Sequence, residues 1–267
     1  MDSSQLTAAY LHRIGATRPA LPDGAALREL QLRHLRSVPF ENLSIHLGED
    51  IVLEEEALVR KVVERHRGGF CYELNGAFAA LLRDLGFRVT LVQARVLGPE
   101  GRTGIPYDHL ALLVETVADN APGGARRWLA DVGFGDHSHR PLDLDERGDQ
   151  QDPGGTFRIV PAPDGDLDVL RDGVAQYRLE VRPRVLADFE AGAWYHSTSP
   201  ASHFTSSLVC SLLTDDGRLT LSGDRLVITA HGVRQERPLS GEDEILAAYR
   251  DHFGLRLDRV PVLRRPD

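Results

Sequence analysis

Cysteine and lysine are nearly absent from this sequence of 267 residues. The two cysteines, Cys71 and Cys210, are too few for the disulfide framework on which small secreted proteins depend. A reducing compartment suits a free and reactive thiol, so we expect a cytoplasmic protein. Lysine occurs once, as Lys61, although arginine is abundant. We interpret this bias as a property of the genome's base composition rather than of the function.

A run of apolar residues long enough to cross a membrane is also missing, and the polar N-terminus lacks the pattern of a signal or transit peptide. The formal net charge of −9 argues against nucleic acid or an anionic membrane as the main partner. Hydrophobic residues make up 42% of the chain and charged residues 27%, which is typical of a globular protein. These features fit an ordinary globular enzyme.

The most informative stretch is the run RGGFCYELN at residues 67–75. Its two glycines end a predicted amphipathic helix over residues 54–67, and Cys71 then begins the next helix. The first N–H groups of a helix have no partner within the helix, and the helix dipole places partial positive charge there. A thiolate is stabilised at such a position, which makes the sulfur a better nucleophile. Cys71 is therefore a candidate catalytic nucleophile.

A base and an orienting carboxylate are present downstream of this cysteine. His109 opens a predicted strand over residues 109–114, and Asp131 lies in a second predicted strand over residues 128–133. Side chains alternate between the two faces of a strand. If the two strands pair, both side chains can point the same way from adjacent positions. With the N-terminus of the Cys71 helix directed at them, they form the nucleophile, base and orienting group of a catalytic triad.

Five runs of this sequence resemble the arylamine N-acetyltransferase family. They are VPFENL at 38–43, RGGFCYELN at 67–75, HL at 109–110, DVGFG at 131–135 and SPxSxF at 199–204. Together they cover most of the chain, and RGGFC combined with DVGFG is highly specific. The resemblance implies that Cys71, His109 and Asp131 are the catalytic triad.

The resemblance also implies which residues bind the substrates. Aromatic residues of the matching runs would line the pocket for the acceptor, namely Phe40, Phe134 and Phe204. The positions expected near coenzyme A or its arm are Gly133, Phe134, Ser202 and Phe204. Asp108 stands where threonine or serine is common in the family, so its carboxylate is expected to touch the path of coenzyme A or to change the pKa of the neighbouring histidine.

The activity implied is transfer of an acetyl group from acetyl-CoA to an arylamine, an arylhydrazine or an N-hydroxyarylamine. Cys71 would first take the acetyl group, and the amine would then attack the acetyl-cysteine, so the kinetics would be ping-pong. The expected partners are the acyl-CoA donor and a small-molecule acceptor. Acetyl-CoA would act as a substrate, and neither a metal ion, nor nucleic acid, nor a membrane is expected to take part.

The hydrophobic pattern divides the chain into three stretches. Residues 1–87 are mostly helical, residues 88–184 are mostly strands, and residues 185–267 are mixed, with a last helix capped by Ser240 and ended by Gly254. The resemblance implies an α+β fold in which these stretches are a helical bundle carrying the nucleophile, an antiparallel β-barrel carrying the base and the carboxylate, and an α/β lid. Their shared catalytic core would be like that of cysteine proteases.

Three alternative functions remain open. An amide synthase of the same family, which releases a polyketide by joining its acyl thioester to an internal aromatic amine, would keep the triad but need a larger cleft. A thiol hydrolase or transglutaminase-like enzyme shares the order Cys, His and Asp, but leaves the runs around Phe40 and Phe134 unexplained. A non-catalytic binding module is disfavoured by the intact triad.

Several other polar residues have two interpretations. His137 and His139 could share one face of a strand and chelate a metal ion, but a clear third ligand is missing, so we expect a solvated loop. Glu73 and Asn75, on the first turn of the Cys71 helix, could hold a network around the site, or could equally cap the helix or face solvent. Cys210 lies in an apolar run and is expected in the core.

Overall fold

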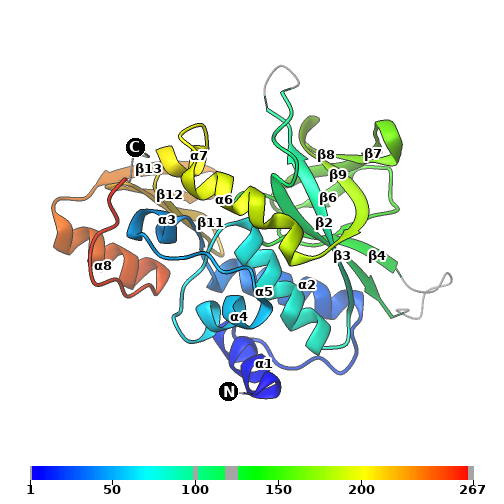
Figure 1. Cartoon of the computed structure of the whole chain (residues 1–267), viewed down its shortest axis with the longest axis horizontal. Helices are drawn as coiled ribbons and strands as arrows, with labels where there is room; N and C mark the ends of the chain where they lie inside the picture. Colours follow the sequence, from blue (N-terminus) through cyan, green and yellow to red (C-terminus); the bar gives the residue numbers. More distant parts are fainter. Residues whose placement is uncertain (1, 99–101, 118–125, 264–267) are drawn as a thin grey trace.

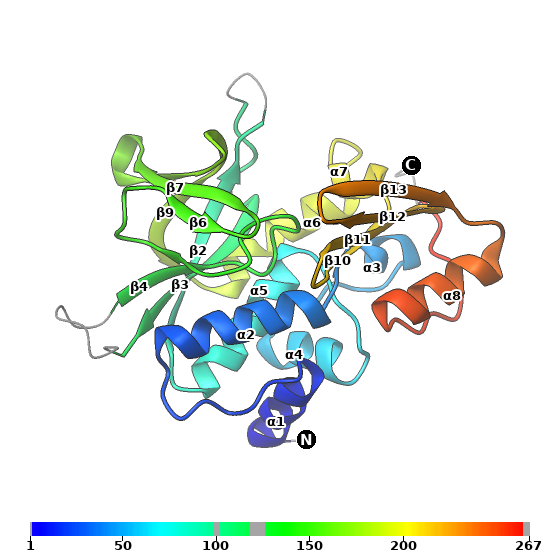
Figure 2. The same ribbon diagram turned by 180° about the vertical axis from the view of Figure 1, so that it is seen from behind.

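The computed structural model describes residues 2–98, 102–117 and 126–263 of the chain. It is an α+β fold in which N-terminal helices, a barrel-like antiparallel sheet and a C-terminal sheet with its own helix surround the helix that begins with Cys71 (Figure 1). The view from behind shows the smaller sheet and the barrel on either side of these helices (Figure 2). This arrangement confirms the predicted order of helices, barrel and mixed α/β elements.

The N-terminal part of the described chain is built mainly of helices, as predicted. They are α1 (Ser3–Arg13), α2 (Gly24–Ser37), α3 (Leu43–Leu47), α4 (Glu55–Val63) and α5 (Cys71–Asp84). Asp23 caps α2 by accepting a hydrogen bond from the backbone N–H of Ala26 at 2.8 Å. The predicted helix over residues 54–67 is shorter than expected. Helix α4 ends at Val63. His66 adopts a left-handed backbone conformation with φ of 53°, and a right-handed helix cannot continue through such a residue.

Eight strands form one antiparallel sheet with the order β5-β4-β3-β2-β9-β8-β7-β6. They are β2 (Arg88–Val96), β3 (His109–Thr116), β4 (Arg126–Ala130), β5 (Leu142–Asp143), β6 (Gln150–Asp152), β7 (Gly155–Pro161), β8 (Leu167–Arg171) and β9 (Val174–Arg184). The side chain of Gln150 donates to the backbone oxygen of Asp143 at 2.9 Å and accepts from its N–H at 2.8 Å. These bonds join the two end strands, so the sheet is a nearly closed barrel.

The C-terminal sheet recruits a strand from the N-terminal part of the chain. Its order is β1-β10-β11-β12-β13, with β1 (Phe40–Glu41), β10 (Val209–Leu213), β11 (Gly217–Ser222), β12 (Arg225–Ala230) and β13 (Val233–Pro238). Phe40 pairs with Ser211, which brings the VPFENL run beside the C-terminal sheet. Cys210 is fully buried in β10, as expected, and burial raises the pKa of its thiol.

A short 3₁₀ turn, η2 (Pro163–Gly165), joins β7 to β8, and a 3₁₀ turn and helices of the later part of the chain connect and cover the sheets. They are η3 (Leu186–Phe189), α6 (Glu190–Thr198), α7 (His203–Ser206) and α8 (Glu242–Phe253). The prediction that Ser240 caps the last helix is wrong by one residue. Gly241 is the N-cap, with φ of 84°, and the Glu244 carboxylate accepts a hydrogen bond from the backbone N–H of Ser240 at 2.6 Å. The helix ends at Gly254, as predicted.

Helix α5 connects the parts of the fold. Its buried residues belong to one hydrophobic cluster that also includes residues of α1, α2, α4, β3 and β4, among them Tyr10, Leu27, Leu58, Leu110 and Ala130. A second cluster fills the barrel, and a third lies between α8 and the C-terminal sheet. Because α5 packs directly on β2 and β3, its N-terminus is held against the start of β3.

Candidate active site

The structure brings the three predicted triad residues together. Cys71 is the first residue of α5, His109 the first residue of β3, and Asp131 directly follows β4. His109 Nε2 lies 2.7 Å from Asp131 Oδ2, and the thiol of Cys71 forms a hydrogen bond with His109. Because Nε2 is taken by Asp131, Nδ1 is the ring nitrogen available to the thiol. The arrangement is that of a nucleophile, a base and an orienting carboxylate.

Strand register explains why His109 and Asp131 meet. β3 and β4 pair antiparallel with Leu112 opposite Ala130. Asp131 follows one residue after this pair, so His109 is its diagonal neighbour on the same face of the sheet. Asp131 itself lies just beyond the strand rather than within it, where its backbone is free to turn toward α5.

Asn75 fixes the carboxylate from the helix that carries the nucleophile. Its Nδ2 donates to Asp131 Oδ1 at 2.8 Å and to the backbone oxygen of Leu110 at 2.7 Å, and its Oδ1 accepts from the N–H of Val132 at 2.9 Å. The N–H of Gly133 donates a further bond to Asp131 Oδ1 at 2.9 Å. Asn75 is fully buried and bonded to Asp131, so it belongs to a network around the site and does not face solvent.

Burial and charge act in opposite directions on the His109–Asp131 pair. Burial disfavours both charged forms, but each partner's charge and their mutual hydrogen bond outweigh it. The pKa of His109 is therefore raised, with help from the hydrogen bond to Cys71, and the pKa of Asp131 is lowered. The pair is held as imidazolium and carboxylate, which is the form that stabilises a neighbouring thiolate.

Tyr177 and His137 complete the surroundings of the triad, and the sequence indicated neither of them as a neighbour of Asp131 or His109. The Tyr177 hydroxyl donates to Asp131 Oδ2 at 3.4 Å, and its ring lies 5.4 Å from that of His109. His137 packs against Phe134 and Tyr177 and is 4% exposed, so the expectation of a solvated loop is wrong for this residue. Burial lowers the pKa of His137 to about 4, which keeps it neutral. The alternation of apolar and polar side chains along β9 places Tyr177 on the same buried face as Leu179, and this pattern could have indicated that Tyr177 points into the barrel.

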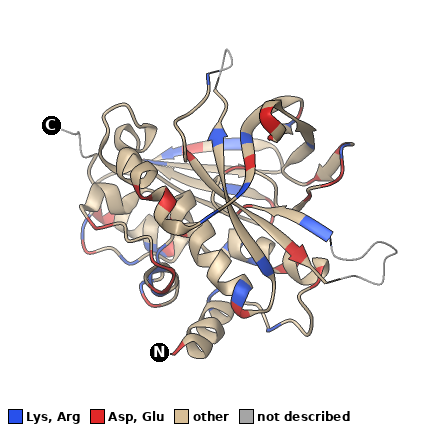
Figure 3. Cartoon of the chain, turned by 45° about the vertical axis from the view of Figure 1, so that its right-hand side comes forward, with Lys and Arg blue, Asp and Glu red and all other residues tan. Residues whose placement is uncertain are grey.

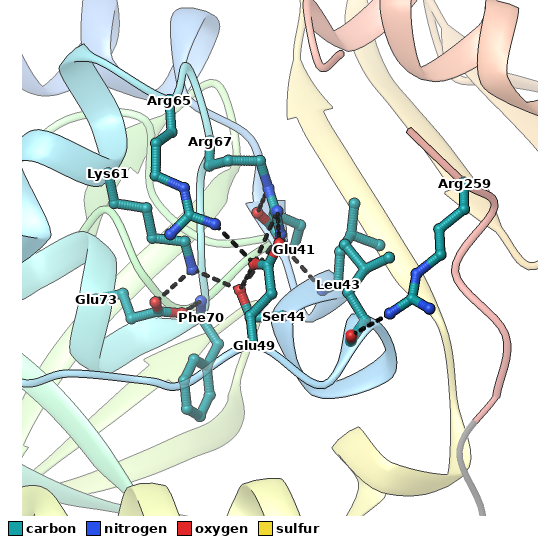
Figure 4. Close-up of polar contacts among 11 residues, drawn as sticks. Glu41, Leu43, Ser44, Glu49, Lys61, Arg65, Arg67, Phe70, Glu73 and Arg259 are labelled. Carbon is teal, nitrogen blue, oxygen red and sulfur yellow. Dashed lines mark hydrogen bonds and ion pairs between the residues drawn. The ribbon is translucent and has the colours of Figure 1, made fainter. Parts of the chain in front are cut away.

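A buried ionic network supports the first turn of α5 from behind (Figure 4). Lys61 bonds to Glu73 and to Ser44 Oγ, and Glu73 accepts a hydrogen bond from the backbone N–H of Phe70 at 3.3 Å. Arg67 forms two hydrogen bonds with the Glu41 carboxylate, at 2.8 and 3.1 Å. Burial raises the pKa of Glu73, and the Lys61 ammonium partly offsets this effect. These bonds anchor the glycine pair and the N-terminus of the nucleophile helix.

A pocket of about 440 Å³ opens above the triad. Four of the predicted binding residues line it, namely Phe40, Gly133, Phe134 and Phe204, together with Cys71 and His109. Ser202 lies behind the wall instead, where it is 3% exposed and its Oγ accepts from the N–H of Phe204 as the N-cap of α7. Lining residues that the sequence did not indicate are Val96, Gly98, Arg102, Thr103, Gly104, His196 and His203.

Among residues 2–98, 102–117 and 126–263, no group of three or more His, Cys, Asp or Glu side chains could hold a metal ion. Within the same ranges, no helix has the length and apolar character needed to span a membrane. Basic and acidic residues are interspersed along the strands and helices drawn in Figure 3.

Known proteins that are similar in sequence and in fold identify the family of this chain. The model of the N-acetyltransferase family matches residues 23–262. An arylamine N-acetyltransferase of Mycolicibacterium smegmatis is 35% identical over 253 residues, which are 93% of this chain and 91% of that protein. The structure of arylamine N-acetyltransferase from Salmonella typhimurium matches with a TM-score of 0.85 at 30% identity, over 96% of this chain and 93% of that one.

A third relative was solved with a ligand. The structure of Mycobacterium marinum arylamine N-acetyltransferase in complex with CoA matches with a TM-score of 0.82 at 32% identity, over 93% of this chain and 92% of that one. The family match covers most of the sequence, and the relatives are similar over nearly their whole length. The chain therefore belongs to the arylamine N-acetyltransferase family of acyltransferases.

Proposed function

We propose that this enzyme transfers an acetyl group from acetyl-CoA to an arylamine, an arylhydrazine or an N-hydroxyarylamine, with Cys71, His109 and Asp131 as the catalytic triad. The observation that carries the proposal is the contact of the Cys71 thiol with His109, whose Nε2 lies 2.7 Å from Asp131 at the base of a substrate-sized pocket. Because the thiol must stay reduced, we also propose a cytoplasmic location.

In the first half-reaction the Cys71 sulfur attacks the thioester carbonyl of acetyl-CoA. The sulfur–carbon bond forms, the bond to the CoA sulfur breaks, and CoA leaves with the proton that His109 took from the thiol. Asp131 holds the imidazole in position and stabilises its protonated form. The backbone N–H groups at the N-terminus of α5 are the donors available to the developing oxyanion.

In the second half-reaction the acceptor amine attacks the acetyl-cysteine. The carbon–nitrogen bond forms, the carbon–sulfur bond breaks, and the amine proton passes to His109 and then to the departing thiolate. Water would hydrolyse the intermediate, so it must be kept out. The rings of Phe40 and Phe204, which lie 6.1 Å apart, make this part of the pocket wall apolar, and the buried ring of Phe70 packs against Phe204 at 5.5 Å.

The substrate sites are proposed from the pocket lining and from the relative solved with CoA. Gly133, Phe134 and Phe204 face the cavity beside Cys71 and are proposed to contact the arm of coenzyme A, with Ser202 holding Phe204 in place. Phe40, Phe134 and Phe204 are proposed to line the acceptor site. A pocket of about 440 Å³ suits an arylamine, whereas the polyketide substrate of an amide synthase would need a larger cleft.

The test is a reaction of the purified protein with acetyl-CoA and a panel of small arylamines and hydrazines, followed through CoA release and the acetylated product. Without an acceptor, intact-mass analysis should show one acetyl adduct, and peptide mapping should place it on Cys71. The Cys71→Ser variant is the control and should form no thioester adduct. Adduct formation on Cys210 instead, or CoA release with acetate as the product even when amine is saturating, would overturn the proposal.

A further inference from the structure

A second carboxylate–imidazole pair lies on the wall of the same pocket. Asp108 precedes His109 at the start of β3, and His196 lies on α6. His196 Nε2 is 2.9 Å from Asp108 Oδ1, and the side chains are 10% and 11% exposed. Both residues line the cavity together with Cys71. The two half-reactions described above make no use of this pair.

Both ring nitrogens of His196 are already occupied. Nε2 faces Asp108, and Nδ1 lies 3.2 Å from Ser202 Oγ. The Ser202 hydroxyl in turn donates to the backbone oxygen of His196 at 3.0 Å. An imidazole has two hydrogen-bonding atoms, so the His196 ring offers the pocket an apolar face but no further hydrogen bond.

Asp108, in contrast, keeps hydrogen-bonding capacity. Oδ2 accepts from the backbone N–H of Val96 at 3.1 Å, and Oδ1 is bonded to His196. Within the described part of the chain these are the partners of its two oxygens. An ionised carboxylate has about four lone-pair sites, so about half of its capacity is unused. The polar group that this wall presents to a ligand is therefore a hydrogen-bond acceptor with negative charge.

The Asp108 carboxylate is held in a fixed position. The Tyr72 hydroxyl donates to the backbone oxygen of Tyr107 at 2.7 Å and lies 3.1 Å from that of Asp108, so it fixes the backbone that carries the carboxylate. Gly104 packs against the carboxylate so closely that a Cβ there would lie 1.8 Å from Oδ2. Arg102 and His203 also line the pocket, but both are exposed, so water screens their charge more than that of Asp108. A ligand in the pocket thus meets a preorganised acceptor.

We propose that Asp108 is a specificity residue that selects acceptors whose ring carries a hydrogen-bond donor, such as a hydroxyl or amino group, and disfavours acceptors whose ring carries a carboxylate. This inference rests on the proposed arylamine acetylation. A donor on the ring satisfies a nearly buried carboxylate with a charge-assisted hydrogen bond. A ring carboxylate brings a second negative charge beside it, and an ether or methyl group leaves its free lone pairs unpaired.

The experiment compares matched acceptors in the wild type and in Asp108→Asn. The pairs are 3- and 4-(hydroxymethyl)aniline against the corresponding methoxymethyl anilines, which differ in one donor and little in basicity. The ratio of kcat/KM within each pair is measured with acetyl-CoA in excess. Dividing the wild-type ratio by the variant ratio cancels the intrinsic reactivity of the amines and any change in the first half-reaction. We expect a preference lower by about tenfold in the variant for at least one isomer.

A parallel arm uses 4-aminobenzoate, whose kcat/KM relative to that of 4-methylaniline should rise in Asp108→Asn. Asp168→Asn is the matched control, because Asp168 is also a partly buried, paired carboxylate but lies on β8 outside the pocket. Its ratios should equal those of the wild type. Asp108→Ser, whose hydroxyl can still accept from Val96, replaces the first variant if melting shows that Asp108→Asn does not fold.

Ratios that are the same in the wild type and in the Asp108 variants, for both isomers and for 4-aminobenzoate, would overturn the inference. Failure of the proposed function is recognised separately. If the wild type acetylates none of the anilines, calorimetric binding of each matched pair to Cys71→Ser and to Cys71→Ser/Asp108→Asn still measures the preference. A donor preference that Asp108→Asn abolishes in this binding measurement supports the role of Asp108, and equal affinities contradict it.

Discussion

Asn75 donates a hydrogen bond to Asp131 over 2.8 Å from a position four residues after Cys71 on the same helix. One helix therefore supplies the nucleophile with its first residue and fixes the orienting carboxylate with a residue four positions further on. Any movement of α5 shifts both groups together, which keeps their geometry constant. The helix that carries Cys71 therefore also positions Asp131, the carboxylate that orients the catalytic base.

Asn75→Ala should reduce both stability and transfer. The variant leaves the backbone groups of Leu110 and Val132, and one oxygen of Asp131, without their present partner in a fully buried site. Unsatisfied buried groups cost about 1–3 kcal/mol each. We expect a loss of at least about 2 kcal/mol in the free energy of unfolding, measured by urea denaturation, together with slower acetyl transfer. Unchanged stability would mean that water replaces the amide fully.

Gly133→Ala adds only one methyl group but should slow acetyl transfer strongly. A Cβ at Gly133 would lie 2.7 Å from Cys71 Cα and 2.7 Å from Asn75 Nδ2, which is closer than atoms can approach. Since α5 is packed on its other side, the strain should displace the nucleophile, and a misplacement of about 1 Å can cost about 10²-fold in rate. Gly148→Ala is the control, because the nearest atom there belongs to the flexible side chain of Glu146. Rates equal to those of this control would refute the argument.

Asp131→Asn should distinguish the role of Asp131 in orienting His109 from its role in stabilising the fold. Asparagine keeps the size of the side chain but loses the charge that raises the pKa of His109, and it can hold the imidazole in the wrong tautomer. By analogy with other triads, transfer should fall by ~10³-fold or more. The rate and the melting temperature are measured on the same preparation. A well-folded and nearly fully active variant would assign the orienting role to another carboxylate, and the neighbouring Asp108 would be tested first.

The sequence was sufficient to predict the proposed triad because its signals are local. A glycine pair before Cys71 marks a helix start, and strand alternation places His109 and Asp131 on one face. The family resemblance then predicted the order of bundle, barrel and mixed α/β part. The exact division at residues 87 and 184 stays a prediction, because β1 leaves the N-terminal stretch to pair with β10 in the C-terminal sheet.

The features that could not be predicted depend on contacts distant in sequence. The pairing of Phe40 with Ser211 joins residues that no local pattern relates. His137 follows a glycine turn and looks solvated in sequence, yet the barrel residue Tyr177 covers it. The pair of Asp108 and His196 is separated by 88 residues, so only the folded chain shows that a second imidazole reaches the pocket.

The stability of the protein should depend on pH through the His109–Asp131 pair. The pKa of His109 is raised on folding, so its contribution is fully present below the unfolded value of about 6.5 and is lost as the pH rises through the folded value. The pKa of Asp131 is lowered, so its contribution is present above the unfolded value of about 3.9 and is lost as the pH falls through the folded value. The pair therefore contributes most between about pH 4 and pH 6.5.

The double variant His109→Gln/Asp131→Asn tests this dependence, because it removes both titrating groups and keeps side chains of similar size. The free energy of unfolding is measured by urea denaturation from pH 3 to pH 10 for the wild type and the variant. The difference between them should be largest in the window between the two unfolded pKa values and should decrease on both sides. A difference that is constant over the whole range would mean that folding shifts neither pKa, and a minimum within the window would mean that the pair is uncharged in the folded enzyme. The imidazolium required to stabilise a Cys71 thiolate would then have to form only when substrate binds.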